Sequence, residues 1–386
     1  MIKVFHIVDF VLFLWMAFFV AYIFIFAVTS LWNRNRFRIK VNSQKINRVL
    51  ILIPAYMEDN VIMDSVNSAI NQNYPKECLQ VIVISDKMND VTNSKLSLLP
   101  VKLLKISPER SSKALAMKLA METVNDCEYD VIIIMDADNT FYEDFVSSVN
   151  EKFNLGVKAL QAHRVAKNTN NYLSVLDALS EEINNSIFRK GHVNLGLSSA
   201  LAGSGMAFDF AWFRDNVKKL KTMGEDKEIE LLLLKDKIYI DYFDELLVYD
   251  AKVEFERTFY NQRRRWVAAQ YGALIKGIKW LSESIVELNY DYLDKIVQWM
   301  LLPRVVIMGI ISVTAVILLI VDWTLSIKWL LLLVCLIFAF ILATPHYLRS
   351  KKTLKAIKKL PVIYLLMFIN LFRIKGADRN FIHTTK

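Results

Sequence analysis

The chain has 386 residues, of which 54% are hydrophobic, and it carries a formal net charge of +9. That apolar share and a mean hydropathy of +0.29 argue against an ordinary soluble protein. Because the basic residues gather beside apolar segments, the charge favours attraction to lipid headgroups over nucleic-acid binding, and the sequence contains no zinc-finger or RNA-binding motif. We therefore expect membrane lipid, and no nucleic acid, among the partners of this protein.

Apolar segments at both ends of the chain predict a membrane protein. Residues 10–31 are almost wholly apolar and match the roughly 20 residues that span hydrocarbon. They lack a small-residue cleavage site, so we interpret them as an anchor and not as a removed signal peptide. Residues 299–321 and 329–347 predict two further spans, whereas residues 360–372 are short and predict an interfacial, re-entrant or tilted segment.

The distribution of basic residues predicts how these segments are oriented. Lys and Arg are frequent in residues 34–48, after the first span, and in residues 349–359, after the third. By the positive-inside rule both flanks are cytoplasmic, so the N-terminus and the loop 322–328 lie outside. We expect an integral protein of the plasma (inner) membrane of a bacterium, with its middle region in the cytoplasm. The expected parts are an N-terminal anchor (1–32), a cytoplasmic domain (33–289), transmembrane and interfacial helices (290–375) and a cytoplasmic tail (376–386).

The middle region alternates short β-rich runs with helical patterns. This rhythm is typical of βαβ units and predicts an α/β fold with a parallel sheet. Open α/β sheets bind ligands at the carboxyl ends of their strands, and polar residues follow the predicted strands at that edge. The predicted strands are 49–53, 80–84 and 131–135, and the predicted helices are 60–72, 112–124, 142–153, 171–189, 227–234 and 258–280.

Two carboxylates follow the predicted strand 131–135. Asp136 and Asp138 project from its end on the same side, with Ala137 pointing the other way. Mg²⁺ or Mn²⁺ prefers oxygen ligands and is often held by one or two carboxylates together with substrate phosphates. The pair therefore predicts a divalent cation held against a diphosphate. Two solvated loop aspartates are the plainer interpretation of such a motif on its own.

Three further places in the sequence have a functional interpretation, and for two of them a plain interpretation stands beside it. Asp226, at the start of a predicted helix, is either a capping carboxylate or a general base that takes a proton from an acceptor hydroxyl, and the neighbouring motifs favour the base. Lys113 opens another predicted helix and could reach a phosphate, but a solvated surface lysine shows the same pattern. Gly203 and Ser204 sit in a small-residue loop, where a backbone could approach a ligand closely.

A basic and aromatic cluster lies on the last predicted helix of the middle region. Gln262 and Trp266 are four residues apart and so share a face. Arg265 suits bidentate contact with a phosphate, and the flat ring of Trp266 suits stacking on a sugar. The alternative is a helix on the membrane surface with an interfacial tryptophan and snorkelling arginines, Arg263 and Arg264 among them.

Together these motifs resemble those of membrane-embedded family 2 glycosyltransferases, the group of cellulose, chitin, hyaluronan and poly-N-acetylglucosamine synthases and of ceramide glucosyltransferase. The resemblance extends from the anchor to the C-terminal spans. It implies a GT-A fold, that of nucleotide-diphospho-sugar transferases, joined to transmembrane helices. The motifs that carry it are Pro54-Ala55-Tyr56-Met57-Glu58, Asp86, Asp136-Ala137-Asp138, Gly224-Glu225-Asp226, and Gln262 with Arg265 and Trp266.

The resemblance implies inverting, metal-dependent transfer of a sugar from a UDP-sugar to a growing β-linked extracellular polysaccharide. Single addition to a membrane lipid is the alternative, and a degenerate transferase acting as scaffold or transporter is the non-enzymatic alternative. Because the spans are few for polymer export, a second copy or an accessory subunit is a further expected partner. In the expected site, Tyr56, Glu58, Asp86, Lys113, Asp136 and Arg265 bind the nucleotide sugar, Asp136 and Asp138 hold Mg²⁺ or Mn²⁺, Asp226 is the catalytic base, and Gly203, Ser204, Glu225, Gln262 and Trp266 bind the acceptor.

The loop after the second strand departs from the family pattern, and the C-terminal tail is similar to a family segment. The loop after the second strand usually reads Asp-Gly-Ser-x-Asp in the family, but here it is Asp86-Lys87-Met88-Asn89-Asp90. Related synthases close a mobile segment with a Thr and a basic residue over the nucleotide, and the tail 381–386 is similar to it. By this resemblance we expect Thr384 and Lys386 to contact the diphosphate, with a disordered terminus as the alternative.

Overall fold

The sheet at the centre of the molecule is mixed, and the prediction of a parallel sheet holds for only part of it. The computed structural model describes residues 2–32, 45–124, 128–361 and 368. Eight strands in those residues form one sheet in the order β3-β2-β1-β4-β7-β6-β8-β5. β1 to β4 run parallel, whereas β7 runs antiparallel to both β4 and β6. The strands are β1 (Val49–Tyr56), β2 (Leu79–Asp86), β3 (Lys102–Ile106), β4 (Val131–Ile134), β5 (Thr140–Phe141), β6 (Ala159–Ala166), β7 (Met206–Asp209) and β8 (Asp241–Asp250).

β1, β2 and β4 confirm the three predicted strands, and their register brings the polar motifs to one edge. Alternate residues of β1 pack into two separate cores, one on each face of the sheet. Burial on both faces explains why these strands read as continuous apolar runs. Tyr56 pairs with Asp86, and Leu52 pairs with Ile134. The residues that follow β1, β2 and β4 therefore meet at the carboxyl edge of the parallel strands.

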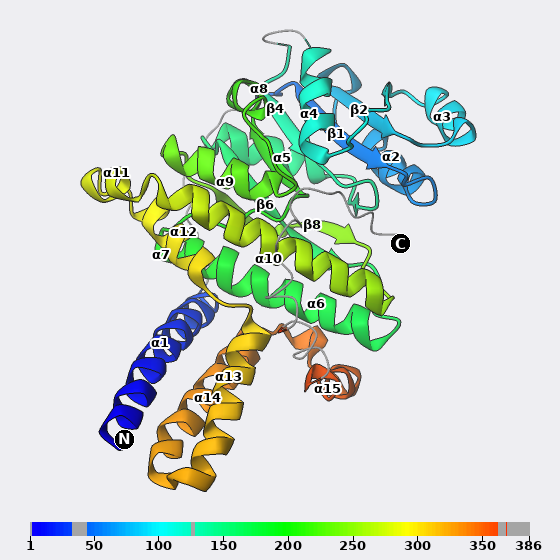
Figure 1. Cartoon of the computed structure of the whole chain (residues 1–386). Coiled ribbons are helices and arrows are strands. Elements are labelled where there is room, and N and C mark those ends of the chain that lie inside the picture. The colour runs from blue at the N-terminus through cyan, green and yellow to red at the C-terminus, as the bar shows by residue number, and fades with distance from the viewer. Residues whose placement is uncertain (1, 33–44, 125–127, 362–367, 369–386) are drawn as a thin grey trace.

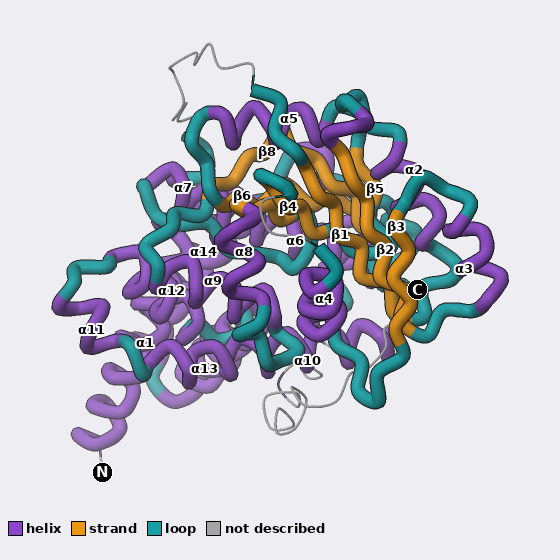
Figure 2. Tube along the Cα trace, turned by 90° about the horizontal axis from the view of Figure 1, so that it is seen from above, coloured by secondary structure: helices purple, strands orange, loops and turns teal. Residues whose placement is uncertain are grey.

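Helices cover both faces of the sheet (Figure 2). α2 and α5 pack on one face, and α4, α8 and α9 pack on the other. α4 begins where the sequence predicted a helix, because the Ser112 hydroxyl accepts a hydrogen bond from the Leu115 N–H at 3.1 Å and caps its first turn. These helices are α2 (Ile62–Ile70), α3 (Asp90–Ser97), α4 (Lys113–Glu122), α5 (Phe145–Asn154), α8 (Phe210–Val217) and α9 (Glu225–Lys235).

A helical layer lies between the sheet and the membrane helices (Figure 1). The predicted helix 171–189 is confirmed as α6, which continues through a π-helical segment into α7. The predicted helix 258–280 is confirmed as α10, which runs alongside α6 across the domain (Figure 1). The elements of this layer are α6 (Tyr172–Asn184), the π-helix η2 (Asn185–Gly191), α7 (His192–Leu195), α10 (Glu256–Ile278), α11 (Leu281–Val286) and α12 (Tyr290–Met300).

Three helices of the described chain are long and apolar enough to cross a membrane. α1 (Ile2–Thr29), α13 (Arg304–Val321) and α14 (Trp323–Ala343) lie side by side and project from the same end of the domain (Figure 1). The ring of Trp329 is fully buried in the core that they share. The start of α1 and the turn between α13 and α14 both lie at the end far from the sheet, which fits the expectation that they share one side of the membrane.

The boundaries of the last two spans differ from the prediction. The loop predicted over residues 322–328 is wrong, because α14 begins at Trp323. Asp322 caps this helix by accepting a hydrogen bond from the Thr324 N–H at 3.0 Å, so the chain reverses at one residue. α14 then ends at Ala343, two residues before Pro345, and a short helix, α15 (Lys351–Ile357), follows. Most of the segment 360–372 and of the flank 34–48, and all of the tail with Thr384 and Lys386, lie outside the described residues.

Candidate active site

One cavity at the carboxyl edge of the parallel strands brings together side chains from all the motifs predicted in the middle region. It has a volume of about 230 Å³, and α10 forms its far wall. Residues that lie far apart in the sequence therefore face one another across a space of ligand size. The predicted site residues on its wall are Tyr56, Glu58, Asp86, Lys113, Asp136, Asp138, Gly203, Glu225, Asp226, Gln262, Arg265 and Trp266.

Asp86 ends β2 with its carboxylate at the cavity wall. The residue is only 3% exposed, and its Oδ1 has no hydrogen-bond partner among the described residues. Burial raises the pKa of this carboxyl above its usual value. A buried acceptor left without a donor costs about 1–3 kcal/mol. Asp86 is therefore suited to accept a hydrogen bond from a ligand, as the N–H of a nucleobase would provide.

The next residue, Lys87, stands where the family pattern has glycine. Its φ of 55° lies in the left-handed region, which glycine enters without strain and other residues enter rarely. The loop nevertheless forms, with the Met57 N–H donating to the Asp86 carbonyl at 3.1 Å. The Lys87 Nζ lies 5.8 Å from the centroid of the Tyr56 ring. The departure from the family pattern thus changes the residue at this position and preserves a glycine-like backbone.

The turn from Asp136 to Asp138 is held from behind by Ser204. The Asp136 N–H donates to Ser204 Oγ at 2.9 Å, and this hydroxyl also contacts Asn139 Oδ1. Ser204 is fully buried. The prediction that Ser204 contacts the acceptor is therefore wrong, because its hydroxyl bonds to the turn and does not reach the cavity. The same hydrogen bonds fix the direction in which the two carboxylates point.

Asp136 and Asp138 fit a divalent cation whose remaining ligands are phosphate oxygens and water. Both line the cavity, and Asp138 is only 4% exposed. No cluster of three or more His, Cys, Asp or Glu side chains in the described part of the chain is arranged to hold a metal alone. The protein would thus contribute two carboxylates. A cation bound there would neutralise charge on a diphosphate.

Lys113 connects this turn to the start of α9. Its Nζ contacts Asp136 Oδ1, donates to the Gly203 carbonyl at 2.6 Å and lies 3.7 Å from Glu225 Oε1. Burial lowers the pKa of the Lys113 ammonium, but Asp136 and Glu225 outweigh this effect and leave the pKa raised. The plain interpretation of Lys113 as a solvated surface lysine is therefore wrong. It is a cation in the wall of the cavity, beside the two carboxylates of the turn.

Glu225 and Asp226 form the first turn of α9, slightly earlier than the predicted helix. Burial raises the pKa of Glu225 to about 7, although a nearby ammonium opposes the effect. Asp226 is more open, with 21% of its side chain exposed, and its Oδ1 accepts a hydrogen bond from the Lys227 N–H at 2.9 Å. Gly224 packs closely on α10, since a Cβ there would lie 2.7 Å from Ala269 Cβ. This close approach packs the start of α9, which carries Asp226, against α10.

α10 presents Gln262, Arg265 and Trp266 to the cavity. The Gln262 Oε1 is buried and has no hydrogen-bond partner within the described ranges. Arg263 lies beside them, with its guanidinium carbon 4.6 Å from the centroid of the Trp266 ring and its Nη2 2.5 Å from Asp177 Oδ1 of α6. Membrane snorkelling is thus the wrong interpretation for Arg263, because an ion pair holds it inside the protein. It also stacks on Trp266, so a sugar would meet another part of that ring.

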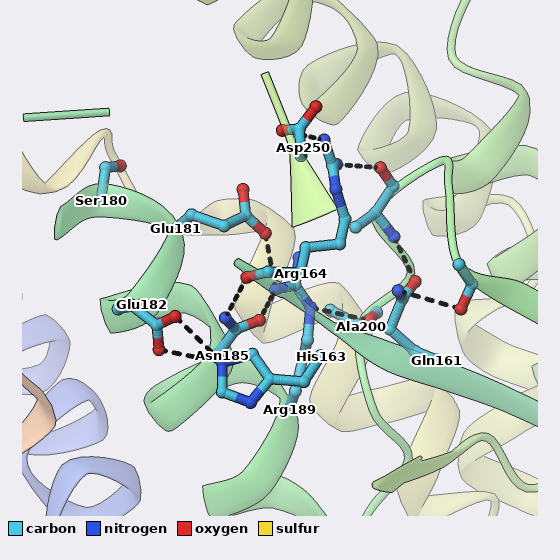
Figure 3. A network of polar contacts seen from close by, with 12 residues as sticks. Gln161, His163, Arg164, Ser180, Glu181, Glu182, Asn185, Arg189, Ala200 and Asp250 are labelled. Atoms are coloured by element: carbon cyan, nitrogen blue, oxygen red, sulfur yellow. Dashed lines mark hydrogen bonds and ion pairs between the residues drawn. The ribbon is translucent and has the colours of Figure 1, made fainter. Parts of the chain in front are cut away.

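Arg164 of β6 and Asp250 at the end of β8 also line the cavity, and the sequence analysis missed both. Arg164 donates to Asp250 Oδ2 at 2.6 Å and to the Ala202 carbonyl at 2.7 Å (Figure 3). A second buried pair, Arg189 with Glu181, lies in the same network (Figure 3). The network holds the loop before Gly203 in place. Its members belong to no local motif, and the strands that carry Arg164 and Asp250 were not predicted.

A second cavity, of about 280 Å³, adjoins the first. Residues of α6, α10 and α12 line it, together with residues 301–305, where α13 begins. Asp226 and Trp266 line both cavities. The predicted base therefore stands between the space that holds Asp86 and a space that extends to the first turn of a membrane helix.

Comparison with known proteins agrees with this arrangement. Residues 131–342, more than half of the chain, match the family described as Glycosyl transferase family group 2. Probable glycosyltransferase YdaM of Bacillus subtilis (strain 168) is 22% identical over 263 residues, covering 64% of this chain and 60% of that protein. The chain thus spans about 60% of the length of the curated relative it matches.

A solved structure has the same fold. Mannosyltransferase PcManGT from Pyrobaculum calidifontis, in complex with GDP-Man and Mn²⁺, is similar with a TM-score of 0.53 at 14% identity, covering 88% of this chain and 98% of that chain. The similarity to S. aureus TarS 1-349 in complex with UDP-GlcNAc is weaker, with a TM-score of 0.43 at 14% identity over 86% of this chain and 91% of that chain.

The protein thus joins a GT-A-like mixed α/β fold to three long apolar helices, which are candidate membrane spans. The chain belongs to glycosyl transferase family group 2. The family is one of glycosyltransferases, which makes transfer of a glycosyl group the reaction to be proposed for this site. The acceptor, the nucleotide of the donor and the stereochemistry of transfer are finer properties, and they are proposed below from the geometry of the site.

Proposed function

We propose that this protein catalyses inverting, metal-dependent transfer of a sugar from a UDP-sugar to an acceptor hydroxyl at the membrane. One observation carries the proposal: Asp86, the pair Asp136 and Asp138, and Asp226 converge on a single cavity. Asp86 would bind the nucleobase, and the pair would hold Mg²⁺ or Mn²⁺ beside the diphosphate. The complex of PcManGT with GDP-Man and Mn²⁺ supports a nucleotide sugar with a divalent cation.

In this proposal each side chain has a separate role. Asp226 takes the proton from the acceptor hydroxyl. The acceptor oxygen then attacks the anomeric carbon opposite the departing UDP, so an α-linked donor gives a β-linked product. Arg265 would stabilise the negative charge of the diphosphate, while Gln262 and Trp266 would seat the acceptor. Basic flanks and three apolar helices support a bacterial inner-membrane protein with this domain in the cytoplasm.

The sequence favoured a growing β-linked extracellular polysaccharide as the acceptor. The second cavity favours the alternative, a membrane lipid. It leads from Asp226 to Leu301, Leu302 and Val305 at the start of α13, so an amphipathic molecule could keep its apolar part in the membrane while its hydroxyl reaches the base. In the described chain three helices are candidate spans, which is few for a polymer path without a second copy or an accessory subunit.

The substitution Asp226→Asn tests the proposal. The amide cannot take the acceptor proton, so turnover should fall by about 10²–10⁴-fold while UDP binding stays nearly unchanged. Release of UDP from a panel of UDP-sugars first identifies the donor, and the variant is then compared with wild type. Asp215→Asn is the matched control, because the Asp215 side chain is 64% exposed on α8. An Asp226→Asn variant that keeps more than about a third of the wild-type rate would exclude Asp226 as the base.

A further inference from the structure

Arg304, the first residue of α13, lies at the membrane end of the second cavity and forms no ion pair with a carboxylate of the described residues. Its Nη2 donates to the carbonyl and the hydroxyl of Ser180, at 3.1 and 3.0 Å. Its Nη1 is buried and has no hydrogen-bond partner in the residues that the structure describes. A buried charge that lacks a counterion is costly. The position of Arg304 in the cavity wall therefore points to an anion that comes from outside the protein.

Two neighbours of Arg304 leave polar atoms unused in the same cavity. Arg263 donates to the Ser180 hydroxyl at 3.1 Å, so one serine brings both arginines together, and its Nε has no partner within the described chain. Gln298 of α12 is only 8% exposed, yet its Oε1 has no partner there either. Both side chains line the cavity. The cavity thus offers a hydrogen-bond donor and a hydrogen-bond acceptor, in addition to the charge of Arg304.

The other cations of the wall are each paired with a carboxylate, so Arg304 is the cation of this wall that is left for a ligand, among the described residues. Guanidinium groups bind phosphate oxygens through two parallel N–H donors. A phosphate group is therefore the anion that this site suits best. The paired cations are Arg164 with Asp250, Arg189 with Glu181, Lys227 with Glu230, and Arg263 with Asp177, at 2.6, 2.8, 3.0 and 2.5 Å.

The two ends of the cavity differ in chemistry. Leu301, Leu302 and Val305 line the membrane end, where Arg304 lies. Asp226 lies on the wall that is shared with the first cavity. A molecule that fills this space needs an apolar part, a phosphate next to it and a hydroxyl beyond the phosphate. Phospholipids with a hydroxyl-bearing headgroup have these parts in that order.

We propose that the acceptor is the phosphate-bearing headgroup of a membrane lipid, with its phosphate on Arg304 and its free hydroxyl at Asp226. This inference rests on the proposed function. In the reaction the hydroxyl proton passes to the Asp226 carboxylate, and the hydroxyl oxygen bonds to the anomeric carbon of the sugar. The bond from that carbon to the diphosphate oxygen breaks, and its electron pair leaves with UDP. The product is a glycosylated phospholipid that keeps its phosphate charge.

The test uses the full chain reconstituted in phosphatidylcholine vesicles, with the radiolabelled UDP-sugar that supports UDP release. Three additions are compared: phosphatidylglycerol, which has the phosphate and free hydroxyls, diacylglycerol, which has a hydroxyl alone, and water-soluble glycerol phosphate. Label should enter the organic phase with phosphatidylglycerol and be cleaved off together with its phosphate headgroup. Equal labelling of diacylglycerol would overturn the role of the phosphate, and equal labelling of glycerol phosphate would overturn the role of the membrane.

Arg304→Gln tests the residue itself. It should lower transfer to phosphatidylglycerol by about 10- to 100-fold, because a charge-assisted contact is lost. Binding of UDP with Mn²⁺ should stay at the wild-type level, which also reports that the variant is folded. Lys352→Gln, on the exposed side of α15, is the control for attraction to acidic vesicles and should transfer normally. Wild-type transfer by Arg304→Gln would overturn the assignment.

Three further outcomes bear on this inference, and the last two separate it from the proposed function. If Arg304→Gln does not fold, Arg304→Lys, which keeps the charge, should still prefer phosphatidylglycerol over diacylglycerol, and loss of that preference would count against the inference. If the wild type releases UDP normally but its label collects in a high-mass polymer, only the lipid acceptor is wrong. If no UDP-sugar yields UDP, the proposed function itself fails.

Discussion

The carboxyl group of Glu225 should make the protein less stable as the pH rises from about 5 to about 7. Glu225 is 8% exposed, and its burial raises its pKa to about 7 from the usual 4.5. Between these values the folded state keeps a proton that the unfolded state has already released. Because the folded state binds more protons in this range, the free energy of unfolding falls as the pH increases, and it levels off above the folded pKa.

The size of the effect follows from the two pKa values. The difference between 7 and 4.5 corresponds to about 3 kcal/mol at 1.36 kcal/mol per pKa unit. Glu225→Gln keeps the shape of the side chain and removes its titration. The variant should therefore be more stable than wild type by about 3 kcal/mol above the folded pKa, which corresponds to several degrees in unfolding temperature, and the two proteins should converge as the pH falls to about 5.

Thermal unfolding in detergent, without nucleotide or metal, measures this difference at a series of pH values. Glu283→Gln is the matched control, because Glu283 is exposed on α11, and its curve should follow that of the wild type. If Glu225→Gln shows the same pH dependence as wild type, Glu225 does not hold the proton and the argument from its burial is refuted.

Three further predictions concern the metal, the nucleotide loop and the packing of α1. Asp138→Ala should abolish the difference in UDP binding between Mn²⁺ and chelator, and an unchanged difference would mean that the cation sits elsewhere. Lys87→Gly should keep or raise the unfolding temperature, whereas Lys87→Val should cost about 1 kcal/mol or more, because a φ of 55° strains β-branched residues; equal stability of the two variants would contradict this. Gly191→Ala would place a Cβ 2.2 Å from the Phe26 carbonyl oxygen and should cost about 1–3 kcal/mol by displacing α1. Gly272→Ala meets open space in α10 and should be neutral or stabilise by up to about 1 kcal/mol, so destabilisation of similar size by both alanines would refute the packing argument.

Sequence patterns predicted the elements whose burial leaves a continuous apolar run in the sequence. β4 is buried on both faces and therefore reads as an uninterrupted apolar run, and the rule that ligands bind at carboxyl ends of strands then placed Asp136 and Asp138. β6 and β8 lack such a signal. His163 and Arg164 interrupt β6, three acidic residues lie within the first five of β8, and their pairing contains an irregularity between Ala162 and His163. They become strands because they pair with each other across a long stretch of sequence.

The candidate site divides in the same way. Residues next to a strand end or a helix start could be predicted, since these positions define an edge of the sheet. Ser204 could not, because a small polar residue can face a ligand or support a turn, and the choice depends on its contacts with Asp136 and Asn139, which lie far away in the sequence. Arg164 and Asp250 belong to no motif, and only the folded chain brings them together.

The spacing of the motif on α10 follows from the place of this helix between the two cavities. A helix surface repeats at intervals of three and four residues, so a wall seven residues long uses positions i, i+3, i+4 and i+7. The first cavity is lined by Gln262, Arg265, Trp266 and Ala269 of α10, and the second cavity by Arg263, Trp266, Val267, Ala269 and Gln270. Trp266 and Ala269 line both cavities, so they stand at the boundary between the first cavity and the space that leads to α13. The amphipathic pattern that suggested a helix on the membrane surface is therefore also the pattern of a helix between two cavities. The side chains proposed to bind the donor and those proposed to bind the lipid then lie on a single rigid element.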